Sequence, residues 1–92
     1  MSPEQAETVA LQALGWLAAQ EDLFGVFLGS SGSSLSDVKD RASEPEFLGS
    51  VLDFLLMDDT WVVAFSDAHG LKYDVAMRAR VALPGGAEVS WT

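Results

Sequence analysis

The chain has 92 residues, of which 49% are hydrophobic, so it can build one small core and has no room for a second. Its 14 Asp and Glu residues against 5 Lys and Arg give a net charge of -9, which disfavours binding to nucleic acid or to anionic membrane surfaces. The absence of cysteine excludes disulfides, thiolate metal sites and a thiol nucleophile.

Two predicted helices occupy the N-terminal third of the chain. Ser2, Pro3 and Gln5 fit a capping box with proline in the first turn, which places a helix start at Ser2. The apolar residues that follow repeat at helical spacing and form one core-facing stripe: Val9, Ala10, Ala13, Leu14 and Leu17. A second, short helix is expected to begin at Glu21 and Asp22 and to end at Gly29.

A stretch rich in glycine and serine, residues 29–34, comes next. A flexible connector is the favoured interpretation. A phosphate-binding loop is the alternative, but the stretch holds no basic residue and lacks the Gly-Lys-Ser/Thr ending of such loops. Ser34 then fits the N-cap of a short third helix that runs to about Ala42, with Leu35 and Val38 facing inward.

The clearest helical pattern runs from Pro45 to Met57, after a break that Glu44 makes because it precedes proline. Its apolar residues keep helical spacing: Phe47, Leu48, Val51, Leu52, Leu55 and Leu56. The opposite face carries Glu46, Gly49, Ser50 and Asp53. We expect this helix at the centre of the fold, with the first helix packed against it.

The segment from Trp61 to Phe65 suits a strand as well as a helix, because it is rich in β-branched and aromatic residues. Helix is the prediction, since no convincing second strand lies nearby to pair with its backbone groups. The helix is expected to end near Ala68 and Gly70.

A last helix is expected from Val75 to Leu83, with Asp74 as its cap. Its inward-facing residues are predicted to be Met77, Val81 and Ala82. The sequence therefore predicts an all-α fold, a single compact domain of five or six short helices over residues 1–86, followed by a tail at residues 87–92.

One group of polar residues resembles metal ligands or an acid/base pair: Asp58, Asp59, Asp67 and His69. A metal site needs three or more converging ligands, and this spacing fits no standard motif. Helix capping by the first two residues and a solvated helix end for the last two are the favoured interpretation. We therefore expect no catalytic residue, no metal and no cofactor.

Three tryptophans are many for so short a chain, and tryptophan is common both in cores and at the centres of protein interfaces. Trp16 lies beside the apolar stripe of the first helix, so it is a candidate partner contact, although core packing is favoured for Trp16 and Trp61. Trp91 in the tail is the second candidate contact, with folding back onto the domain as the alternative.

Two stretches, LDFLLMDDTWVVAF at residues 52–65 and ARVALPGG at residues 79–86, carry a family resemblance. With ALGWL at residues 13–17 and the turn at residues 28–32, they show that the chain resembles an alphaproteobacterial family of short acidic helical proteins of unknown function. The resemblance transfers no functional residue. Because members are often encoded beside a single-domain response regulator, it implies a regulatory protein partner.

The function that we expect is a non-enzymatic protein-interaction or regulatory module. The acidic N-terminus lacks the basic region of a signal peptide, and Asp53, Asp58 and Asp59 interrupt the most apolar segment, so a cytoplasmic protein is expected, without a membrane association. One alternative is an acidic nucleic-acid mimic that binds a basic protein. Another is a small metal-assisted enzyme that uses the four polar residues.

Overall fold

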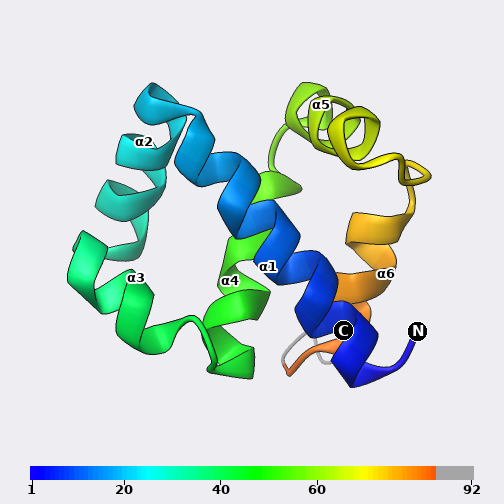
Figure 1. The fold of residues 1–92 in the computed structure, drawn as a ribbon, viewed down its shortest axis with the longest axis horizontal. Coiled ribbons are helices and arrows are strands. Elements are labelled where there is room, and N and C mark those ends of the chain that lie inside the picture. Colours follow the sequence, from blue (N-terminus) through cyan, green and yellow to red (C-terminus); the bar gives the residue numbers. More distant parts are fainter. Residues whose placement is uncertain (85–92) are drawn as a thin grey trace, which may run out of the picture.

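The computed structural model describes residues 1–84 and shows six α-helices, and no strand, within that range. In chain order they are α1 (Pro3–Ala19), α2 (Glu21–Ser31), α3 (Leu35–Arg41), α4 (Pro45–Leu55), α5 (Asp59–His69) and α6 (Val75–Ala82) (Figure 1). The all-α prediction is confirmed, and the segment around Trp61 is helical.

Three of the helices, α1, α3 and α5, begin at side-chain caps that the sequence contains. Ser2 accepts a hydrogen bond from the Gln5 backbone N–H at 3.1 Å, and the Gln5 side chain accepts one from the Ser2 N–H at 3.0 Å. This reciprocal pair satisfies two backbone donors that the first turn leaves without partners. Ser34 and Asp37 form a second reciprocal pair at the start of α3. Asp58 caps α5 by accepting from one backbone N–H, that of Thr60, whereas Asp74 makes no side-chain cap for α6.

The end of α2 differs from the prediction. Gly29 does not end the helix, which continues to Ser31 and stops at Gly32, whose φ of 69° lies in the left-handed region that glycine adopts without strain. Half of the stretch rich in glycine and serine is therefore helical, and the connection to α3 is short.

The core forms where α1 crosses α4 and packs beside α6 (Figure 1). The predicted stripe of α1 is buried, and α4 is the most apolar helix, with Leu52 and Leu55 completely inaccessible to solvent. The predicted packing of α1 against α4 is confirmed, but the central position predicted for α4 belongs to α1, which contacts α2, α4, α5 and α6, whereas α4 packs mainly on α1 and α6. No helix within residues 1–84 combines the length and the apolar character needed to cross a bilayer.

Three residues expected to face inward do not. Leu35 on α3 and both Met77 and Val81 on α6 are more than half exposed. The buried residues of α6 are instead Ala76 and Ala79. These small side chains let α6 approach α1 closely, and α1 also buries alanines in its stripe. The interface between α1 and α6 is therefore built from small residues, while the larger apolar residues of α6 face outward. Hydrophobicity alone does not predict this choice.

An arginine clamp fastens α6 to α4. The guanidinium of Arg80 donates to both carboxylate oxygens of Asp53 and, through Nη1, to the carbonyl of Pro84 at 2.9 Å. It lies over Gly49, which is buried although the sequence pattern placed it on the polar face of α4. A side chain at position 49 would occupy the space that the guanidinium takes.

Candidate functional site

An open groove of about 660 Å³ lies between the end of α1, the start of α2 and the first half of α5. The chain turns sharply at Gln20, where α1 ends and α2 begins, and this turn brings the first residues of α2 beside α5. The lining residues are Trp16, Ala19, Gln20, Glu21, Asp22, Leu23, Thr60, Trp61 and Ala64.

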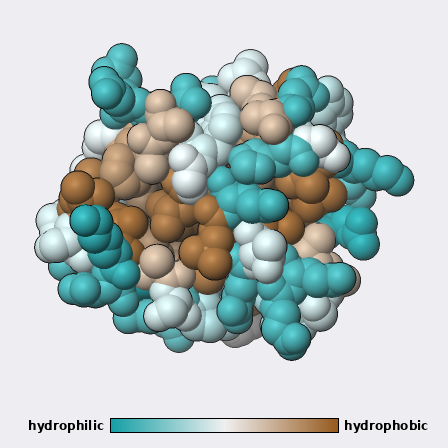
Figure 2. Space-filling model, viewed as in Figure 1, coloured by the Kyte–Doolittle hydropathy of each residue, from teal (hydrophilic) through white to brown (hydrophobic). Residues whose placement is uncertain are grey.

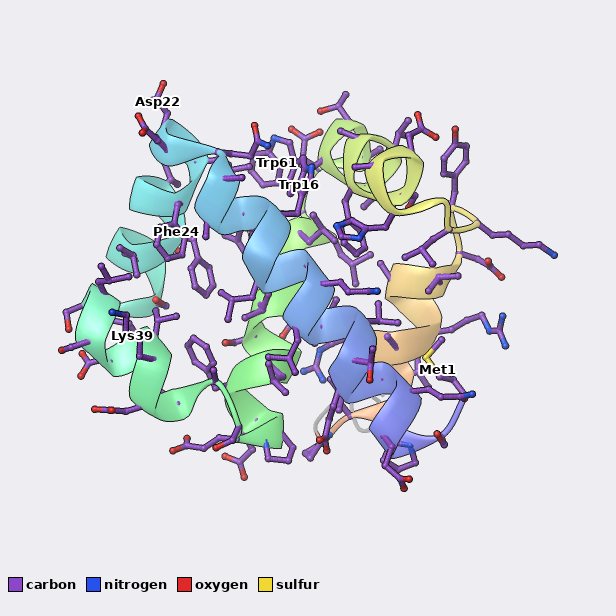
Figure 3. All side chains as sticks on the ribbon, in the orientation of Figure 1. Met1, Trp16, Asp22, Phe24, Lys39 and Trp61 are labelled. Carbon is purple, nitrogen blue, oxygen red and sulfur yellow. The ribbon has the colours of Figure 1, made fainter. Side chains whose placement is uncertain are left out.

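Two tryptophans form the apolar part of this groove. Figure 3 shows Trp16 and Trp61 next to each other between the end of α1 and α5. The ring of Trp16 meets Phe65 edge-on, with centroids 6.3 Å apart, and Trp61 stacks on Phe54 at 5.1 Å. Phe54 and Phe65 belong to the core, so the indoles are held from behind while both remain half-buried.

Carboxylates form the polar part. Glu21 and Asp22 occupy the first turn of α2 and are exposed. Asp58 does not line the groove itself, but it accepts hydrogen bonds from the lining residue Thr60, from the hydroxyl at 2.6 Å and from the N–H at 2.8 Å. The bond from the hydroxyl has the larger effect and the bond from the N–H the smaller one. Together they hold the pKa of Asp58 below its usual 3.8, so this carboxylate stays ionised.

The helices that wall the groove contain neither lysine nor arginine. The five basic residues lie in α3, in the α5–α6 connection and in α6: Lys39, Arg41, Lys72, Arg78 and Arg80. Within residues 1–84 each arginine also has an acidic partner of its own, at Glu44, Asp74 and Asp53 respectively. The negative charge of the groove therefore has no cation on its own walls.

The polar group proposed from the sequence is divided between the two ends of α5. Asp58 and Asp59 stand at its start and Asp67 and His69 at its end, about 12 Å apart by the helical rise of 1.5 Å per residue. Asp67 accepts a hydrogen bond from the Tyr73 hydroxyl at 2.9 Å. Among residues 1–84 no three His, Asp or Glu side chains come together in a way that could hold a metal.

Of the two candidate contact residues, Trp16 lines the groove and Trp91 lies outside the described residues. The sequence did not single out Glu21, Asp22 or Trp61 as members of the same site. The sequence placed Glu21 and Asp22 at the start of a helix, and the structure confirms this position. That this helix start faces α5 follows only from the turn at Gln20, which the structure shows.

The surface around the groove is mixed in character. Figure 2 shows hydrophobic atoms gathered in two places, between α1 and the α2–α3 pair and on the opposite side of α1 towards α5 and α6, while the upper edge is mostly pale and hydrophilic. That edge is where Figure 3 places Asp22, Trp16 and Trp61. The groove thus combines aromatic rings with charge and is not a plain apolar patch.

Comparison with known proteins identifies the family. No curated protein and no solved structure matches the chain. A family described as protein of unknown function (DUF3572) matches residues 3–86, which is most of the sequence. The family resemblance seen in the sequence is confirmed at that level, and the chain belongs to the DUF3572 family.

Proposed function

We propose that the protein is a non-enzymatic interaction module and that the groove between α1, α2 and α5 is its docking surface. The observation that carries the proposal is the pair of half-buried indoles, each supported from the core by a phenyl ring, beside exposed carboxylates. Rigid aromatic residues with part of their surface accessible are the usual anchors of protein interfaces.

The groove lining favours recognition over catalysis. Its one hydroxyl group, that of Thr60, donates its hydrogen bond to the carboxylate of Asp58. A nucleophilic hydroxyl needs an adjacent base that is oriented by a third group. His69, the one histidine of the chain, lies at the far end of α5 and packs against Phe65, with ring centroids 4.9 Å apart. The Thr60 hydroxyl therefore faces a carboxylate whose lowered pKa makes it a weak base, and the histidine lies at the other end of the helix.

A nucleic-acid mimic is the less favoured candidate. Mimicry needs carboxylates in a row along one face, whereas the acidic residues within 1–84 are spread over α1 to α5 and the connections between helices, and several stand in first helical turns. Acidic side chains at those positions stabilise the helix dipole, which accounts for much of the net charge. The bacterial cytoplasm and the link to response-regulator signalling stay predictions.

The proposal is tested by blocking the groove without disturbing the core. Ala64 lines the groove and is exposed, and Ala68 is exposed one turn further along α5 outside it. Ala64→Arg therefore fills the groove, and Ala68→Arg is the matched control with the same change of charge. Each variant and the wild type serve as bait for affinity capture from the native host, followed by mass spectrometry.

We expect a partner that the wild type and Ala68→Arg retain and Ala64→Arg loses. Circular dichroism of the three proteins confirms that all are folded. Retention of the same partners by Ala64→Arg would show that the groove is not the docking surface. Loss of the partners by both variants would show that charge anywhere on α5 is what matters.

A further inference from the structure

We infer that the groove binds an arginine side chain from a basic segment of a partner protein, with the guanidinium lying between the indoles and the carboxylates of α2. This inference rests on the proposed function, because it names the occupant of the same docking surface. Three features of the groove carry it: the sign of its charge, the kind of surface that the tryptophans present, and the way in which it continues along α5.

Charge selects a cation. Glu21 and Asp22 line the groove, and the last turn of α1 beside them carries no basic side chain that would offset the partial negative charge of that helix end. The starts of α2 and α5 bring partial positive charge, but acidic residues in both first turns offset it. A cation that enters the groove meets no lysine or arginine side chain on α1, α2 or α5.

The tryptophans select a flat cation. Indole is the best aromatic partner of a cation, and a guanidinium is planar, weakly hydrated and able to stack while its N–H groups reach carboxylates. The chain already makes a contact of this kind elsewhere, where the Arg41 guanidinium carbon lies 4.9 Å from the centre of the Phe47 ring. Trp16 and Trp61 line the groove and are only half-buried, so an arginine from outside can reach their rings.

The size and continuation of the groove indicate a segment of chain as the occupant. The groove of about 660 Å³ is larger than one side chain needs, and it is open to solvent. It shares Thr60 and Ala64 with a shallow hollow on the outer face of α5, where Val63 lies between Asp59 and Asp67. A peptide that places arginine in the groove can continue over this hollow.

The test uses the full chain and the probe acetyl-arginine amide, followed by NMR at constant ionic strength. The indole N–H signals of Trp16 and Trp61 are identified by Trp→Phe substitutions. Acetyl-citrulline amide has nearly the same shape as the arginine probe but no charge. Acetyl-lysine amide has the positive charge but no planar group. We expect saturable shifts of both indole signals with the arginine probe, weaker ones with lysine and none with citrulline.

Two double variants separate the groove from general charge. Glu21→Gln with Asp22→Asn removes two charges from the groove, and Asp40→Asn with Glu46→Gln removes two exposed charges from α3 and α4. The groove variant should bind the arginine probe roughly tenfold more weakly, and the control should bind within about twofold of wild type. Equal weakening in both would overturn the inference.

The outcome also separates this inference from the proposed function. Arginine and citrulline probes that bind alike, lysine that binds as well as arginine, or no saturable shift would each reject the arginine occupant. If Ala64→Arg still loses its partners in such a case, the groove remains the docking surface for another chemistry. If Ala64→Arg keeps its partners, the docking surface itself is wrong, whatever the probes do.

Discussion

Gly49→Ala tests how the Arg80 clamp joins α4 to α6. A Cβ atom at position 49 would stand 2.9 Å from Arg80 Nη1, 3.2 Å from its Cζ and 3.5 Å from the Pro84 carbonyl oxygen. The first distance is too short for van der Waals contact, so the guanidinium has to move away from the helix. Its bonds to Asp53 and to Pro84 are then weakened or lost.

Two opposing effects set the magnitude. Alanine in a helix interior is better than glycine by about 1 kcal/mol. Against this, the bond to the Pro84 carbonyl contributes about 1 kcal/mol, and the ion pair with Asp53, whose side chain is 58% exposed, contributes up to about 1 kcal/mol. Gly49→Ala should therefore change the free energy of unfolding by about 0 to -1 kcal/mol.

Gly49→Ala is therefore also made in a variant that carries Arg80→Met, because methionine keeps an apolar stem and has no guanidinium. In that background Gly49→Ala meets no obstacle and should raise the free energy of unfolding by about 1 kcal/mol. Urea titrations of the four proteins, followed by circular dichroism, give a coupling energy that we expect at about 1 to 2 kcal/mol. A coupling below about 0.3 kcal/mol would refute the clamp.

Four further changes test the core, one exposed helix position and one ionisation. Leu52→Ala, at a fully buried site in α4, should cost about 2 to 5 kcal/mol in urea titrations, and a loss below about 0.5 kcal/mol would remove Leu52 from the core. Gly25→Ala should gain about 1 kcal/mol, since position 25 is exposed and an added Cβ meets nothing within 4 Å; a loss would contradict this. Ser66→Ala should gain about 1 kcal/mol, because the buried Ser66 hydroxyl has no hydrogen-bond partner in the described part of the chain, and a comparable loss would mean that the hydroxyl is satisfied. The hydrogen bond and negative charge of Asp67 raise the pKa of Tyr73 above 10.0, so this contribution to stability is present below that pH and is lost as the pH rises through the folded-state pKa. Tyr73 is the single tyrosine, so phenolate absorbance reports it directly: Asp67→Asn should bring its pKa back towards 10.0, and an unchanged titration would contradict the contact.

The helices were predictable because each one carries its own signals. The capping box at Ser2, the cap at Asp58 and the apolar spacing of α4 are local features, and the structure confirms each of them. Apart from the end of α2 and the cap expected at Asp74, the errors concern which face is buried when a helix is short or has mixed apolar residues. On α6 the choice between Met77 and Ala76 depends on how closely α1 approaches, and this distance is not encoded within α6.

The candidate site was only half predictable for a similar reason. Trp16 stands out in the sequence because it lies at the edge of an apolar stripe, and the structure leaves it half-buried. Its neighbours Glu21 and Trp61 are separated by 40 positions and meet through the turn at Gln20 and the placement of α5. Contacts of this kind depend on the packing of whole helices, which no local pattern specifies.

The two walls of the groove differ in how firmly the fold holds them. The aromatic wall is fixed, because Trp61 stacks on buried Phe54. The acidic wall belongs to α2, in which Phe27 is the one fully buried residue and Gly25 is an exposed interior glycine. Helices with few buried contacts open most easily, so ordering α2 can be part of the free-energy cost of binding. Gly25→Ala decides this: higher stability with unchanged affinity for the arginine probe means that the groove is already formed in the free protein, whereas a gain in both means that binding orders α2.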